Sequence, residues 1–146
     1  MKKLVLTVLA AAGVFFSAQA VLAQQQAAAL PVLTSKAYAS MKKDDVYVVM
    51  FSAAYCGPCR VAKKELFPAL IEKYRQDANV HFFVLDVEKD VPAADGTYLK
   101  DKWGVEGLPT FAVVYNDTVM YAARGYSAKT APGIRQNIEN KVNALK

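Results

Sequence analysis

Two cysteines three positions apart are the residues of this chain whose spacing suits redox chemistry. Cys56 and Cys59 enclose Gly57 and Pro58, and the 146-residue sequence contains no other cysteine. A disulfide that closes a loop of two intervening residues adds little stability, because it removes little entropy from the unfolded chain. On one helical turn, however, such a pair can open and close a disulfide with little backbone motion. The pair therefore favours thiol–disulfide exchange, and an inert local disulfide or a metal site stays open as an alternative.

The segments around the pair favour a reactive thiolate at Cys56. A β-branched and aromatic run at residues 46–51 ends just before it and a helical pattern follows, so Cys56 is expected at a helix start. There the free N–H groups and the helix dipole stabilise an anion, and Pro58 fits the first turn. A thiol whose pKa falls from ~8.5 to ~7 goes from about 3% to about half ionised at pH 7. We expect Cys56 to attack and Cys59, one turn deeper, to resolve the mixed disulfide.

The hydrophobic pattern predicts the elements that must position these cysteines. Unbroken apolar runs indicate buried strands, and apolar residues at helical spacing indicate amphipathic helices. We expect a strand at 30–33, a helix capped by Thr34 or Ser35 that ends near Lys43, and a strand at 46–51. A helix from Cys59 to about Asp77, with a kink or break at Pro68, and a strand at 80–87 should follow. The last elements are a short helix at 98–103 closed by Gly104, a hairpin at 110–115 and 118–123, and a helix that starts at Ser127 or Thr130. This order implies an α/β fold, with a central mixed β-sheet flanked by helices on both faces.

The cysteine motif and a later proline motif resemble the thioredoxin family. Cys56-Gly57-Pro58-Cys59 follows a buried strand, and the run Leu-Pro-Thr at 108–110 precedes a later strand; the resemblance covers about residues 30–145. It implies a thioredoxin fold and a protein-disulfide oxidoreductase that needs no cofactor beyond the Cys56–Cys59 disulfide. Gly57 and Pro58 would be the dipeptide of the active site.

The resemblance also implies which residues would meet a substrate. Pro109 would be cis and lie against the cysteines, which leaves the Leu108 backbone free to pair with a substrate peptide. Gly125 fits the family's glycine near the rim of the active site. The tryptophan that usually precedes the first cysteine is Tyr55 here, which is either a rim residue that touches substrate or a packed aromatic.

Two departures from the cytoplasmic family pattern concern proton transfer. The position of the buried acid on the incoming strand is Met50, and the neighbouring lysine position is Val84. Deprotonation of Cys59 would then need water or another group. Asp86 and Glu106 are candidates for that role, although solvated surface charge is the simpler interpretation of both.

The other aromatic and metal-ligating side chains are expected to be structural. A zinc site normally needs four ligands, and His81 is the single histidine beside two cysteines, so we expect no metal. His81 is interpreted as a structural residue at a strand end. Core positions are expected for Trp103, Phe82, Phe83 and Phe111.

The first 23 residues have the layout of a secretory signal peptide. Lys2 and Lys3 precede an apolar run at residues 4–16, and small residues allow cleavage after Ala20 or Ala23. A less favoured alternative is an uncleaved membrane anchor. We therefore expect a signal peptide at 1–23, a flexible lead at 24–29, a thioredoxin-like domain at 30–146, and a mature protein that is periplasmic or secreted.

The chain carries a mild excess of positive charge. The formal net charge of +5 falls to +3 without the two leading lysines, and no basic run or nucleic-acid motif is present, so nucleic acid is not an expected partner. We expect a monomeric, exported thiol–disulfide oxidoreductase that acts on cysteine-containing exported proteins, as a reductant that draws electrons from a membrane protein. The alternative is a redox-quiet binding, chaperone or metal-delivery module with the same fold.

Overall fold

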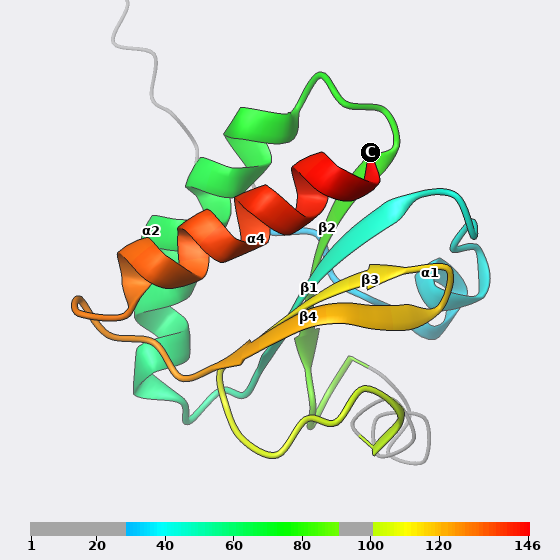
Figure 1. Ribbon diagram of the computed structural model, residues 1–146. Coiled ribbons are helices and arrows are strands. Elements are labelled where there is room, and N and C mark those ends of the chain that lie inside the picture. Colours follow the sequence, from blue (N-terminus) through cyan, green and yellow to red (C-terminus); the bar gives the residue numbers. More distant parts are fainter. Residues whose placement is uncertain (1–28, 91–100) are drawn as a thin grey trace, which may run out of the picture.

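The computed structural model describes residues 29–90 and 101–146 (Figure 1). The predicted signal peptide at 1–23, the lead up to residue 28 and the first half of the predicted short helix at 98–103 lie outside the described residues. Asp101 and Lys102, which are described, are helical, and Gly104 follows them with a positive φ of 62°. No helix in the two described ranges is long and apolar enough to cross a membrane.

Within the described residues, four strands form one mixed sheet in the order β2-β1-β3-β4. β1 pairs in parallel with β2 and antiparallel with β3, which in turn forms a hairpin with β4. Asn116 and Asp117 make the hairpin turn, and both have the positive φ that a tight hairpin requires. The strands are Val46–Ser52 (β1), Val80–Asp86 (β2), Thr110–Tyr115 (β3) and Thr118–Arg124 (β4).

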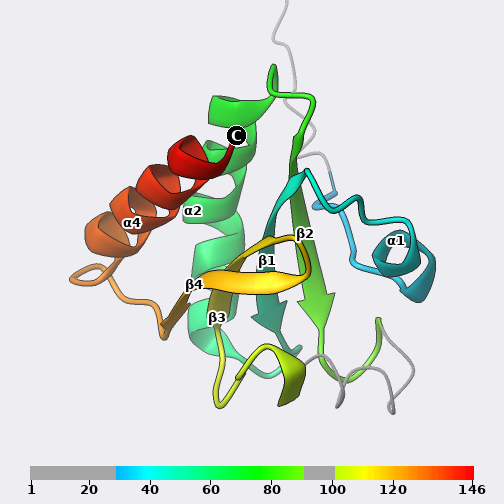
Figure 2. The same ribbon diagram turned by 45° about the vertical axis from the view of Figure 1, so that its right-hand side comes forward.

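Helices cover both faces of this sheet, as the sequence predicts (Figure 2). The helices α2 (Gly57–Tyr74) and α4 (Ala131–Leu145) lie on one face, and the short α1 (Ser35–Ala39) lies on the other. All seven residues of β1 are buried, because this strand is central in the sheet and covered on both sides.

Two apolar clusters form the core, one on each face of the sheet. Phe82 and Phe111 are buried under α2 and α4, and Trp103 is buried on the α1 side, as predicted. Phe83 is only partly buried and packs against the edge of the α1-side cluster. Because side chains alternate along a strand, neighbouring residues of β1 contribute to opposite clusters.

The structure corrects the prediction for the first two elements. Residues 30–33 form an isolated parallel bridge rather than a strand: Val84 N donates to Pro31 O, and Leu33 N donates to Val84 O. Pro31 has no N–H with which to extend the ladder, and Thr34 already caps α1 by accepting from Ala37 N at 3.1 Å. The helix then ends at Ala39 rather than near Lys43.

The helix α2 continues through Pro68 without the predicted break. Pro68 is exposed, and so is Lys64, whose carbonyl loses the backbone donor that proline cannot supply. Water can satisfy that carbonyl. Phe67 beside the proline is fully buried, so packing of the inner face holds the helix together.

Candidate active site

The cysteine pair lies at a tight turn from β1 into α2. Cys56 is the N-cap of α2, and its N–H donates to Ala53 O at 3.2 Å. The N–H of Cys59 points at the sulfur of Cys56, with a distance of 3.2 Å between the nitrogen and Sγ. Pro58 occupies the first turn of the helix, where its missing N–H costs nothing. The chain therefore places a backbone donor against the sulfur that the sequence assigns as the attacker.

Cys56 and Cys59 form a disulfide in this structure, with their Cα atoms 5.2 Å apart. Cys56 retains 6% of its surface exposed and Cys59 retains none. Of the two cysteines, only Cys56 therefore has surface that another protein can contact. This difference in access is what a nucleophile and a resolving cysteine require.

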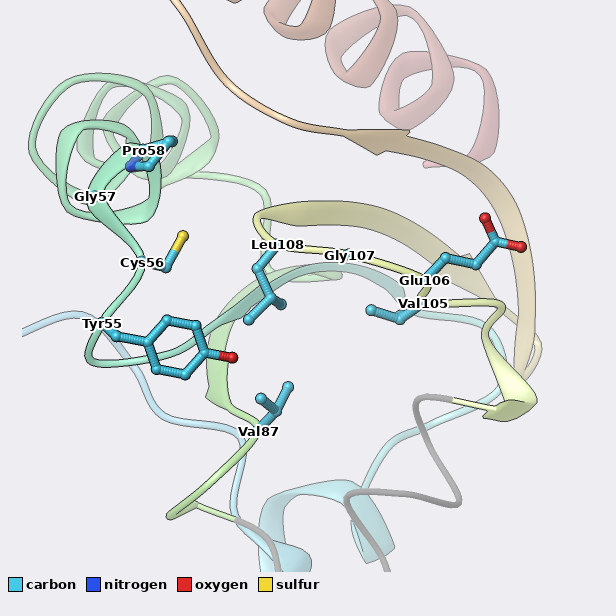
Figure 3. A pocket seen from close by; sticks show the side chains of 9 residues that line it. All are labelled: Tyr55, Cys56, Gly57, Pro58, Val87, Val105, Glu106, Gly107 and Leu108. Carbon is cyan, nitrogen blue, oxygen red and sulfur yellow. The ribbon is translucent and has the colours of Figure 1, made fainter.

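A groove of about 470 Å³ opens beside Cys56 (Figure 3). The ring of Tyr55, which is 70% exposed, and the side chains of Leu108 and Val87 project into it. Its walls are mainly apolar, so they suit a peptide segment with apolar side chains. The lining residues are Tyr55, Cys56, Gly57, Pro58, Val87, Val105, Glu106, Gly107 and Leu108.

Hydrogen bonds fix the loop that carries Leu108. The Leu108–Pro109 peptide bond is cis, and Pro109 O accepts a 2.8 Å hydrogen bond from Gly125 N. The hydroxyl of Thr110 donates to Gly107 O at 2.7 Å. Among the residues predicted to bind substrate, Tyr55 and Leu108 line the groove, whereas Pro109 and Gly125 do not.

Sequence reasoning missed three groove residues, Val87, Val105 and Gly107. Val105 and Gly107 come just before Leu108 in the chain, so nearness to the proline motif was an available signal. Val87 follows β2, and its N–H donates to Ser52 O at 2.9 Å. This hydrogen bond joins residues far apart in the sequence, and no local sequence pattern predicts it.

The residues beneath the cysteines are apolar, as the sequence predicts. Met50 and Val84 are buried in the same cluster as Cys59. Glu106, one of the two acids considered for proton transfer, pairs with Arg124 at 3.0 Å, and its carboxylate points away from the cysteines (Figure 3). Glu106 is therefore a poor proton acceptor for Cys59.

Tyr126 follows Gly125 and packs on Phe111, with 6.1 Å between the ring centroids. Its hydroxyl lies 3.5 Å from the carboxylate of Glu65. Burial and the nearby Glu65 charge raise the pKa of Tyr126 above its ordinary value. The phenol therefore stays protonated at neutral pH and cannot accept a proton from a thiol.

The described residues contain no group of three or more histidine, cysteine, aspartate or glutamate side chains placed to hold a metal. His81 Nε2 lies 2.8 Å from Asp45, and the histidine ring stacks on Tyr47 with 5.0 Å between centroids. These contacts fit the structural role that the sequence predicts for His81.

A family model described as thioredoxin matches residues 29–140 of this chain. The chain belongs to the thioredoxin family. It is 34% identical over 73 residues to a thioredoxin H-type of Ricinus communis, a match that covers 50% of this chain and 53% of that protein. A thioredoxin H-type of Picea mariana is 26% identical over 111 residues, which cover 76% of this chain and 75% of that one. The chain thus spans about half the length of the first relative and three quarters of the second.

Solved structures confirm the predicted thioredoxin fold. The crystal structure of oxidised mitochondrial thioredoxin 3 from Saccharomyces cerevisiae superposes with a TM-score of 0.58 at 22% identity, covering 76% of this chain and 94% of that one. Thioredoxins need no cofactor. In a member of this family, a CxxC pair at disulfide distance supports thiol–disulfide oxidoreductase activity.

Proposed function

We propose that this protein is an exported thiol–disulfide oxidoreductase that reduces disulfides in other exported proteins. The observation that carries the proposal is the position of Cys56 at the start of α2, where it lines an apolar groove and is disulfide-bonded to a fully buried Cys59. Two thiols with no surface open to a client would not support the same activity.

The proposed reaction begins with both cysteines reduced. The thiolate of Cys56 attacks one sulfur of a client disulfide, which breaks that disulfide and forms a mixed disulfide with the client. The thiol of Cys59 then loses its proton and attacks the Cys56 sulfur. The mixed disulfide breaks, the client leaves as a dithiol once its sulfurs are protonated, and the protein holds the Cys56–Cys59 disulfide. Two electrons have passed from the protein to the client.

The groove supports a role in holding the client during this exchange. Leu108 stands next to Cys56 on a loop that is fixed by the Gly125–Pro109 hydrogen bond. A client segment in extended conformation can pair with the backbone of Leu108 while its apolar side chains contact Tyr55 and Val87. Such contacts hold the reacting sulfurs at attack distance, which raises the rate by lowering the entropy cost of the encounter.

Export and reducing direction rest on the sequence. The signal-like layout of residues 1–23 supports secretion or a periplasmic location, and the Gly57-Pro58 dipeptide resembles the reducing members of the family. A reductant outside the cytoplasm needs electrons, so a membrane protein is proposed as the donor. We also propose that the protein acts as a monomer and binds no nucleic acid.

Insulin reduction tests the activity. The wild-type protein with dithiothreitol should precipitate insulin faster than dithiothreitol alone, and Cys56→Ser should abolish the gain. Equal rates for both proteins would favour a redox-quiet binding module instead. Alkylation after acid quench then reports the redox state of Cys56 and Cys59 in cells. Mostly reduced thiols fit a reductase, and mostly oxidised thiols would contradict that direction.

A further inference from the structure

Two polar residues end neighbouring strands where the chain leaves the sheet for α2. Ser52 is the last residue of β1, Asp86 is the last residue of β2, and the two are partners in the parallel register. The ends of these strands lie side by side (Figure 2). Partners in a parallel ladder project to the same face of the sheet, so the hydroxyl and the carboxylate share one face.

That face is the one on which the cysteines lie. Met50 and Val84 are also register partners, and both pack in the cluster that contains Cys59. Side chains two residues apart share a face, so Ser52 and Asp86 continue the same two rows toward the cysteine end of the sheet. The step from one pair to the next is about 6.6 Å. The first pair is apolar, and the next pair supplies a hydroxyl and a carboxylate.

Ser52 is fully buried, and its Oγ has no hydrogen-bond partner among the described residues. Leaving a buried hydroxyl unpaired is unfavourable, so a hydrogen bond formed by Ser52 in another redox state would remove that cost. Asp86 is half-buried, and one carboxylate oxygen accepts from Glu88 N at 3.0 Å. A carboxylate has room for further hydrogen bonds, so the second oxygen remains a capable acceptor.

We infer that Asp86 accepts, through the Ser52 hydroxyl, the proton that Cys59 releases when it resolves the mixed disulfide. This inference rests on the proposed function. While Cys56 is bonded to the client, Cys59 is a free thiol whose sulfur is no longer tied to Cys56 and can turn toward Ser52. The buried hydroxyl accepts the thiol hydrogen bond, directly or through one water, and donates its own hydrogen to Asp86.

The step balances in atoms and electrons. The S–H bond of Cys59 breaks as its proton passes to the Ser52 oxygen, and the Ser52 hydroxyl gives up its own proton to the Asp86 carboxylate, through hydrogen bonds that form only in the mixed-disulfide state. The electron pair left on Cys59 attacks the Cys56 sulfur, so the Cys56–Cys59 bond forms as the Cys56–client bond breaks. The client sulfur leaves with the electron pair of that bond. Asp86 is half-buried, so it can return the proton to solvent.

Other charged residues near this strand end also affect how the proton transfer to Asp86 depends on pH. On α2, Arg60 reaches the turn before Cys56 by donating to Ala54 O at 3.3 Å. Lys63 lies one turn before Phe67, so the two residues share a side of the helix. The ring centroid of Phe67 is 5.9 Å from that of Phe82 on β2, which places Lys63 on the β2 side. The turn after β2 carries Glu88, Lys89 and Asp90, and Asp90 accepts from Asp86 N at 2.8 Å.

Stopped-flow reaction of the reduced protein with Ellman's reagent separates the two steps. Attack by Cys56 releases one thionitrobenzoate, and attack by Cys59 releases the second. We expect Asp86→Asn and Ser52→Ala to slow the second release about 100-fold at pH 7, as loss of general-base assistance does, and to leave the first unchanged. The deficit should shrink at higher pH, where hydroxide removes the proton, and Asp86→Glu should restore part of the rate. Glu88→Gln is the matched control, since it removes a charge two residues away.

The outcomes distinguish this inference from the proposed function. A wild-type protein that gives no fast first release would overturn the proposed function. A normal first release with an unchanged second release in Asp86→Asn would overturn the inference alone, as would equal slowing in Glu88→Gln or at every pH. If Ser52→Ala does not fold by circular dichroism, the Asp86 variants and their pH profiles decide the question.

Discussion

The backbone N–H of Cys59 points at the sulfur of Cys56 across 3.2 Å. Cys56 is also the N-cap of α2, so the positive end of the helix dipole lies at the same atom. In the disulfide this contact has little charge to act on. Once the disulfide is reduced, the same donor faces a thiolate, and a charge-assisted hydrogen bond to it is about twice as strong as a neutral one. The geometry of the oxidised pair is therefore already suited to the reduced state.

The difference in access between the cysteines predicts a trapping result. Cys59→Ser should accumulate mixed disulfides with client proteins, because Cys56 can attack but nothing resolves the product. Cys56→Ser should trap nothing, since Cys59 is fully buried. Non-reducing gels of extracts from cells that express each variant measure the adducts. Equal amounts from both would contradict the assigned roles.

The groove predicts a loss of client binding without a loss of chemistry. Leu108→Ala keeps the backbone of the loop and removes an apolar wall beside Cys56. We expect KM for an insulin substrate to rise about 5-fold, which corresponds to roughly 1 kcal/mol of lost apolar contact, with kcat unchanged. Met120→Ala is the control, because Met120 is 40% exposed on β4 and lies outside the groove. A fall in kcat alone would argue against a binding role for Leu108.

The contact between α2 and α4 predicts a pH-dependent stability. Glu139 on α4 is largely buried and accepts from Lys73 of α2 and from Arg135 at 2.9 Å. Burial acts to raise the pKa of Glu139, but the two cations outweigh it and the pKa is lowered from its ordinary value. A lowered folded-state pKa adds stability above the unfolded pKa of about 4.3, and this stability is lost as the pH falls through the folded pKa.

Glu139→Gln should therefore lower the free energy of unfolding by about 0.5 to 1 kcal/mol at pH 7 and by much less in acid below pH 4. Urea denaturation at both pH values measures the difference. Glu72→Gln is the control, because its carboxylate and its partner Arg75 are 71% and 62% exposed. A cost for Glu139→Gln that is the same at both pH values would show that packing, and not charge, explains it.

Much of the fold and the centre of the site could be predicted from the sequence. The run at 46–51 has apolar side chains on both faces, as expected of a central strand that is covered on both sides. The CGPC motif at 56–59 follows this strand and marks the start of α2. The predicted strand at 30–33 failed because Pro31 withholds a donor, an effect that hydrophobic pattern alone underweights.

The remaining parts of the site depend on contacts between distant segments. Val87 belongs to the groove because its strand lies beside β1, and nothing in its local sequence indicates this. The pairing of Ser52 with Asp86 is likewise a matter of strand register, and the register is set by the packing of both clusters. A sequence shows both residues but not that they are neighbours.

The pKa of the Cys56 thiol in the reduced protein tests the central claim most directly. The rate of alkylation by iodoacetamide, followed against pH and assigned to Cys56 by mass spectrometry, reports the fraction of thiolate. We predict a midpoint of ionisation well below the ~8.5 of a free cysteine, because the Cys59 amide and the start of α2 stabilise the anion. A midpoint equal to that of cysteine in a short peptide would contradict the account.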